Sequence, residues 1–150
     1  MPDRPMLICY DGSKEARRAL STAAAVLSPR PAVVLELAQP VTAEEEEVAF
    51  LFSGGPGDSL DQRVRDVRRT AHRGVQLARA EGLDATERVD VAGTVWKGVV
   101  AVADDLDASV IVVGSRGLRG ARELVEGSLS HDLAIHAGRP LLVVPPPASG

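Results

Sequence analysis

The chain has 150 residues, enough for one domain with a substantial core, and its 45% apolar and 25% charged residues are typical of a globular protein. Aromatic residues make up only 3%, so the core must be aliphatic, and surfaces that stack single-stranded nucleic acid are disfavoured. The net charge of -4 gives no basic surface for DNA or RNA. We therefore expect one domain over residues 1–150 that binds no nucleic acid.

The opening segment and the single cysteine bear on the compartment. The first residues, MPDRPMLICYDGS, lack the long apolar stretch of a secretory signal, and no run approaches the roughly 18 apolar residues of a membrane span. Cys9 has no second cysteine to pair with and lies in an apolar segment, which favours an inert core thiol over a reactive one. We expect a cytoplasmic protein without membrane association.

Short aliphatic runs alternate with amphipathic stretches along the chain. The runs predict strands at 6–11, 32–38, 85–91, 109–114 and 140–144. Apolar residues at helical spacing predict helices at 13–27, 59–81, 95–106 and 128–137. This alternation predicts an α/β fold with a parallel sheet and helices on both faces. The prolines at 145–147 cannot continue a sheet, so residues 145–150 are expected to form a flexible tail.

The connection over residues 39–58 is the part expected to be irregular. It contains four consecutive glutamates, Glu44 to Glu47, followed by a Gly/Pro cluster, which together indicate a mobile surface segment. A solvated charge run is favoured over a cation site built from these glutamates. Phe50 and Phe52 could make the segment a lid or a contact for a partner, and the sequence does not decide between these roles.

The stretch after the 109–114 run is rich in glycine. Gly114, Gly117 and Gly120 fall every third residue, so backbone N–H groups could form a nest for an anion. Gly127-Ser128 then opens the next predicted helix, whose free N–H groups and dipole favour a phosphate. The pattern is neither a Walker A loop nor the Gly-x-Gly-x-x-Gly fingerprint. An ordinary glycine loop followed by a Ser-capped helix is the alternative.

The spacing Gly114-x2-Gly117-x9-Gly127-Ser128 resembles the ATP-binding signature of the universal stress protein family. The opening MLICYDGSKEARRAL and the closing GSLSHDLAIHAGRPLLVVP resemble the corresponding blocks of that family, and 39–58 is the least matched part. The resemblance implies an open, Rossmann-like, five-stranded parallel sheet of order 3-2-1-4-5. It also implies ATP as ligand, with Mg²⁺.

The resemblance assigns roles to the loop after the first strand. Asp11 would contact the ribose, the base edge or a metal-bound phosphate, and Gly12 and Ser13 would complete the loop. A purely local role, in which Asp11 caps the helix that begins near Ser13, stays open beside this one. Asp11 is also the residue that would serve Mg²⁺.

The remaining site residues follow from the same resemblance. Leu37 takes the position whose backbone contacts adenine, although Glu36 stands where the family commonly has histidine. Arg116 matches a common family position, with a solvated arginine as the alternative. The full set expected to bind nucleotide is Asp11, Gly12, Ser13, Leu37, Gly114, Arg116, Gly117, Gly127, Ser128, Leu129 and Ser130.

These features favour a nucleotide-binding regulatory module of the stress response, with slow or no hydrolysis, because no base is placed to activate an attacking water. A Ser128–His131–Asp132 triad is rejected, since neighbouring helical residues point in different directions. An AMP or cyclic-nucleotide binder, a slow ATPase and a nucleotide-free interaction module are the alternatives, and the glycine signature argues against the last. The final strand, 140–144, would form a sheet edge in the 3-2-1-4-5 order, which predicts a homodimer through it.

Overall fold

The computed structural model describes residues 4–115 and 129–148, and within them the chain alternates strands and helices as the apolar runs predict. The strands are β1 (Met6–Cys9), β2 (Ala32–Ala38), β3 (Ala85–Val91), β4 (Val110–Gly114) and β5 (Leu141–Val144). The helices are α1 (Lys14–Val26), α2 (Ala43–Ser53), α3 (Leu60–Ala80), α4 (Val95–Leu106) and α5 (Leu129–His136). All strand pairs are parallel and their order is β3-β2-β1-β4-β5, as expected.

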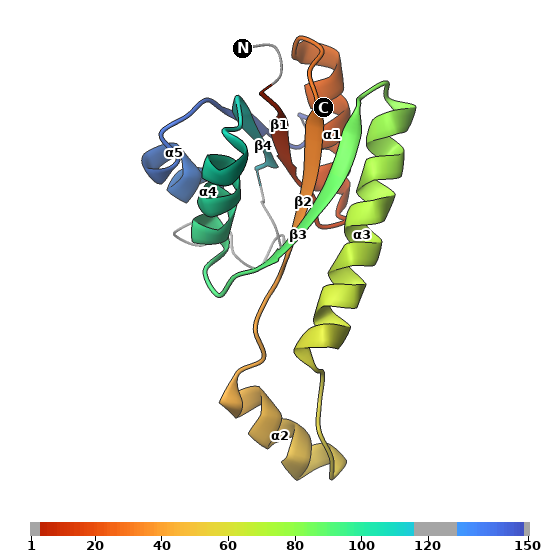
Figure 1. Ribbon diagram of the computed structural model, residues 1–150, viewed down its shortest axis with the longest axis vertical. Helices are drawn as coiled ribbons and strands as arrows, with labels where there is room; N and C mark the ends of the chain where they lie inside the picture. Colours follow the sequence, from red (N-terminus) through yellow and green to blue (C-terminus); the bar gives the residue numbers. More distant parts are fainter. Residues whose placement is uncertain (1–3, 116–128, 149–150) are drawn as a thin grey trace.

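Helices cover both faces of this sheet (Figure 1). On one face α1 and α3 enclose a core that includes Met6, Ile8 and Leu20, and on the other α4 and α5 enclose a core that includes Leu7 and Val99. The central strands β1, β2 and β4 are buried on both faces, which explains why they consist of apolar residues apart from Glu36 in β2. The expected α/β fold with helices on both faces is confirmed.

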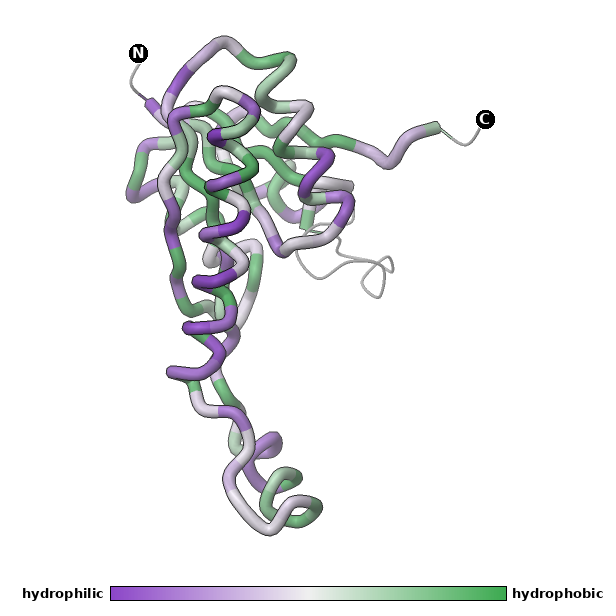
Figure 2. The backbone as a smooth tube through the Cα atoms, turned by 90° about the vertical axis from the view of Figure 1, so that its right-hand side faces the viewer, coloured by the Kyte–Doolittle hydropathy of each residue, from purple (hydrophilic) through white to green (hydrophobic). Residues whose placement is uncertain are grey.

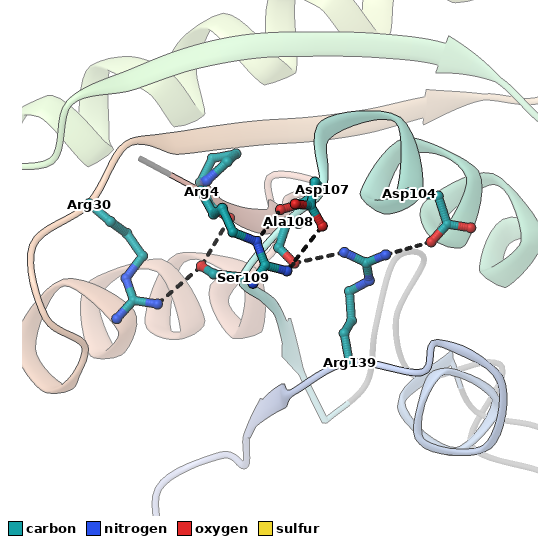
Figure 3. Close-up of polar contacts among 8 residues, drawn as sticks. Arg4, Arg30, Asp104, Asp107, Ala108, Ser109 and Arg139 are labelled. Carbon is teal, nitrogen blue, oxygen red and sulfur yellow. Dashed lines mark hydrogen bonds and ion pairs between the residues drawn. The ribbon is translucent and has the colours of Figure 1, made fainter. Parts of the chain in front are cut away.

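The sheet edge formed by the amino ends of the strands is closed by side-chain contacts (Figure 3). Arg4 pairs with Asp107 at 3.0 Å, and Arg30 donates to the hydroxyl of Ser109, also at 3.0 Å. Arg139 donates to the carbonyl just before Ser109 at 2.7 Å. Three arginines from separate segments thus tie this edge together, so the opposite edge, where the strands end, is the place for a ligand.

The expectation of an irregular connection at 39–58 is wrong, because the glutamate run forms helix α2. Thr42 and Glu45 make a reciprocal capping box: the Thr42 hydroxyl accepts from the Glu45 N–H, and the Glu45 carboxylate accepts from the Thr42 N–H, both at 3.1 Å. Gly54 ends the helix in the left-handed conformation, with φ of 68°. The segment is exposed, as expected of a charge run, but its backbone is regular.

Helix α2 lies well away from the sheet, at the end of a long projection (Figures 1 and 2). None of its residues is buried. The first half of α3 belongs to the same projection, since the buried residues of α3 begin only at Ala71. We refer to residues 43–70, which comprise α2, its link to α3 and the first half of α3, as the arm.

No helix in residues 4–115 or 129–148 is both long enough and apolar enough to cross a membrane.

Candidate nucleotide-binding site

The loop between β1 and α1 is built by short polar contacts. The Oδ1 atom of Asp11 accepts a hydrogen bond from the Ser13 N–H at 2.9 Å, and the Ser13 hydroxyl accepts from the Ala16 N–H at 3.1 Å. Gly12 lies between them with φ of 84°, a conformation that favours glycine. Ser13, and not Asp11, caps α1, so the local role expected of Asp11 is corrected: its side chain shapes the turn before the helix.

Gly114, the last residue of β4, lies against the first turn of α1. A Cβ atom at Gly114 would stand 3.0 Å from the carbonyl oxygen of Glu15 and 3.2 Å from its Cβ. A larger residue would push α1 away from the sheet and shift the Asp11 loop. Gly114 thus has a packing reason to be glycine, and this role is compatible with its expected place beside a nucleotide.

The end of β2 holds the only charged side chain buried among the described residues, Glu36. Its Oε1 atom accepts a hydrogen bond from the N–H of Leu37 at 2.9 Å, and Leu37 itself is buried. At the position whose backbone is expected to contact adenine, the N–H group is therefore already engaged by the neighbouring carboxylate. The substitution of glutamate for histidine at position 36 changes the donors and acceptors that this corner of the site can offer.

Two carboxylates lie near the single thiol at the carboxyl end of β1. Burial raises the pKa of the Cys9 thiol far above its ordinary value, and the negative charges of Glu36 and Asp11 raise it further. A thiol held neutral in this way is a poor nucleophile and a poor metal ligand. The expectation of an inert core thiol is confirmed, and Cys9 is excluded from any chemistry of the site.

The start of α5 lies at the same edge of the sheet. Because α5 precedes the parallel strand β5, its amino end faces the carboxyl ends of the strands. Leu129 buries its side chain in the core beneath α4 and α5, and Ser130 is half-buried. The other expected residues of this half, Arg116, Gly117, Gly127 and Ser128, lie outside the described residues.

A cavity of about 540 Å³ opens beside the Asp11 loop, between α1 and α3. Its lining residues are Tyr10, Asp11, Gly12, Arg17, Thr70, Arg73, Gln76 and Leu77. Within the described part of the chain, the side chains of Arg17 and Arg73 form no ion pair or hydrogen bond, so they bring positive charge to this cavity. Sequence reasoning missed both arginines, because only the packing of α1 against α3 brings them together.

The structure thus gathers part of the expected site. Asp11, Gly12, Ser13 and Gly114 surround the start of α1, where β1 and β4 lie side by side. Leu37 and Leu129 face the opposite core, beneath α4 and α5. No group of three or more histidine, cysteine or acidic side chains suited to a metal ion exists among the residues that the structure describes.

An open parallel sheet of this order, with its connections reversing between β1 and β4, defines the class of Rossmann-like α/β proteins. The model of the universal stress protein family matches residues 4–145, and the chain belongs to that family. A search among curated proteins found no match.

Several solved structures share the fold. The universal stress protein from Archaeoglobus fulgidus is 25% identical with a TM-score of 0.68, over 94% of this chain and 93% of that chain. A structure described as the universal stress protein from Archaeoglobus fulgidus in complex with dAMP is 23% identical with a TM-score of 0.66, over 96% and 99% of the two chains. A universal stress protein in complex with cAMP is 20% identical with a TM-score of 0.68, over 96% and 98%.

Proposed function

We propose that this universal stress protein binds an adenine nucleotide, with ATP as the leading candidate, at the edge where β1 and β4 end. The observation that carries the proposal is the adjacency of β1 and β4, which puts the Asp11 loop and the amino end of α5 at one edge of the sheet. Nucleotides bind at such a point in open parallel sheets. The dAMP and cAMP complexes of the two relatives support adenine as the base.

In this proposal the backbone provides most of the contacts. The N–H groups at the start of α5, near Leu129 and Ser130, would face the phosphates, together with Gly117, Gly127 and Ser128. Asp11 would meet the ribose or the metal, with Gly12 and Ser13 completing the loop. Arg116 would add positive charge. Leu37 and Gly114 would border the base and the ribose.

Mg²⁺ would accompany ATP in this proposal. Mg²⁺ commonly uses one or two carboxylates and takes its other ligands from phosphates and water, so a single carboxylate such as Asp11 fits it. The lack of an acidic cluster among the described residues is compatible with a metal held chiefly by the nucleotide. When bound, the ion would neutralise phosphate charge, and Asp11 would orient it.

We further propose that the nucleotide regulates the protein and is hydrolysed slowly or not at all. Fast phosphoryl transfer needs a group that orients the attacking water, and the expected site residues contain one carboxylate, already engaged in the turn. Such a module would act as a nucleotide-dependent regulator in the stress response. The single buried thiol of Cys9 fits action in the reducing cytoplasm.

Native mass spectrometry of the freshly purified protein tests the ligand's identity, and calorimetric titration with ATP, AMP and cAMP tests affinity. We expect Gly117→Val and Gly127→Val to abolish binding while the chain stays folded, and Ser128→Ala to weaken it about tenfold. A folded Gly117→Val or Gly127→Val variant that binds ATP like the parent contradicts the proposal.

We also propose that β5 forms a homodimer through its free edge. Strand β5 pairs with β4 on one side only, carries no charged residue, and leaves Val143 exposed. The prolines that follow would limit the length of the pairing. Val143→Lys should lower the oligomeric state of the chain in sedimentation velocity experiments, because it removes association through this edge. A parent chain that stays monomeric, or an oligomeric state that Val143→Lys leaves unchanged, contradicts the assignment.

A further inference from the structure

The arm exposes more apolar surface than its setting explains. Both phenylalanines of the chain lie on α2, with Phe50 58% and Phe52 85% exposed, and Val48 and Leu51 are exposed beside them. In the rest of the described chain, exposed large apolar residues are scattered over separate elements. Val48, Leu51 and Phe52 share one face of α2 at helical spacing, whereas Phe50 lies on the opposite side. Such an apolar patch on a projecting element marks a surface that another molecule covers.

A second uncovered apolar surface lies on the first half of α3. Leu60, Val64 and Val67 recur at helical spacing, so they form one stripe. Leu60 is exposed, and Val64 and Val67 are only half-buried, whereas the same stripe is buried from Ala71 onward, where α3 reaches the sheet. The arm therefore presents two apolar surfaces, one on each of its helices.

The two helices carry opposite charge. Helix α2 has four glutamates and no basic residue, whereas α3 has six arginines against two aspartates. Among the described residues, Arg63 alone forms an ion pair between the two helices, with Glu45 at 3.0 Å. The described residues offer no ion pair or hydrogen bond to the side chains of Glu44, Glu46 and Glu47.

Some of the complementary charges on α3 have no partner on another element. The side chain of Arg68 lies beside the apolar stripe, four residues from Val64, and forms no ion pair or hydrogen bond within the described part of the chain. In residues 4–115 and 129–148, Arg65 donates only to Gln62 of its own helix, at 2.7 Å. Both views of the molecule place α2 beyond the amino end of α3 and not alongside it (Figures 1 and 2). The acidic helix therefore cannot reach most of the arginines of its own chain.

We propose that α2 docks onto the first half of α3 of a second copy of this chain, and that the two copies exchange their arms. In this arrangement Leu51 and Phe52 cover the stripe of Leu60, Val64 and Val67, and the glutamates of α2 meet the arginines that flank the stripe. The contact is the same in both directions, as a two-fold axis requires. A membrane surface fits less well, because four glutamates are repelled by anionic lipid.

This interface is separate from the proposed pairing of β5, so the test uses the full chain carrying Val143→Lys. We expect this chain to sediment as a dimer at micromolar concentration. Adding Leu51→Ser and Phe52→Ser should weaken association by roughly 30-fold or more, as the loss of central apolar anchors does. The matched control is Val26→Ser with Ile135→Ser, two exposed apolar residues outside the arm, which should leave the dimer intact.

Charge exchange gives a second, independent measurement. Glu46→Arg with Glu47→Arg puts two positive charges on α2 in place of two negative ones, and Arg65→Glu with Arg68→Glu makes the first half of α3 acidic, each in the Val143→Lys chain. Each variant alone should be monomeric because like charges meet, and a mixture of the two should form a heterodimer in which both contacts are attractive.

Circular dichroism and thermal unfolding must first show that each of these chains keeps the parent's fold. A Val143→Lys chain that is monomeric, or a variant with Leu51→Ser and Phe52→Ser that associates like its parent, would overturn the proposal. So would two charge variants that fail to associate when mixed.

Discussion

Helices α1 and α2 begin in the same way and end in different surroundings. Each starts with a side-chain cap, from Ser13 in α1 and from Thr42 in α2. Helix α1 then buries four residues against the sheet, including Leu20, whereas α2 buries none. A cap decides where a helix starts, but an isolated helix of 11 residues is marginal in water. Helix α1 is therefore stabilised by burial against the sheet. Helix α2 is stabilised by local polar contacts and by any molecule that covers its apolar residues.

The largest expected effect is on the free energy of unfolding, which should fall when a core residue of the sheet is truncated but hardly change when an exposed residue of the arm is truncated. Leu20 is fully buried, so Leu20→Ala should lower the free energy of unfolding by about 2–5 kcal/mol. Phe52→Ala removes a larger side chain, but Phe52 is exposed, so the change should stay within about 0.5 kcal/mol for the dissociated chain. Denaturant unfolding at low protein concentration measures both. Comparable losses in the two variants would show that Phe52 is buried within its own chain.

Loss of the Asp11 charge should weaken nucleotide binding, because Asp11 lies at the edge of the sheet where β1 and β4 end. Asp11→Asn keeps an oxygen that can accept from the Ser13 N–H, so the turn should survive while the negative charge is lost. Calorimetry should then show ATP affinity reduced about 10–100-fold, with the larger loss in the presence of Mg²⁺. Asp61→Asn, which removes a charge from the arm, is the control and should bind like the parent. An Asp11→Asn chain with unchanged affinity would leave Asp11 with its turn-forming role alone.

Much of the sheet could be predicted from the sequence because a buried parallel strand needs a continuous aliphatic run. The order of the strands came from the family resemblance, since such runs do not say which strands are neighbours. Helix α2 was missed because the glutamate run was interpreted as a loop, although Thr42-x-x-Glu45 carries the spacing of a capping box. Local hydrogen bonds outweighed the repulsion among the charges.

The candidate site was predictable where it depends on adjacent residues and not where it depends on packing. Asp11 and Ser13 shape a turn within three residues, so the sequence alone indicates this turn. Arg17 and Arg73 line one cavity only because α1 packs beside α3, a long-range contact without a local signature. The hydrogen bond from the Leu37 N–H to Glu36 likewise has no local signature, because it forms only once burial leaves the carboxylate in need of a donor.

Removal of each helix cap, Ser13 in α1 and Thr42 in α2, should have a smaller effect on stability. Ser13→Ala should cost about 1 kcal/mol of the free energy of unfolding of the whole chain, or roughly 2–4 °C in the melting temperature, because α1 unfolds together with the sheet. Thr42→Ala should leave the melting temperature unchanged and speed amide exchange only near Glu45 and Glu46, because α2 can unfold alone. Equal shifts in melting temperature would show that the arm unfolds with the sheet.

The smallest expected effect is the response of the arm to acid. The hydrogen bond from the Thr42 backbone lowers the pKa of the Glu45 carboxyl, and the contacts with Arg63 lower it further. Since the folded pKa is depressed, this contribution to the stability of α2 is fully present above the ordinary glutamate pKa of about 4.3 and is lost as the pH falls through the lowered value. Titration followed by NMR should therefore show the first turn of α2 unchanged from pH 7 to pH 5 and loosening only in more acidic solution. Glu45→Gln is the control, and its first turn should show no such step. A transition near neutral pH in the parent chain, or an unaltered acid step in Glu45→Gln, would mean that groups other than Glu45 hold the arm.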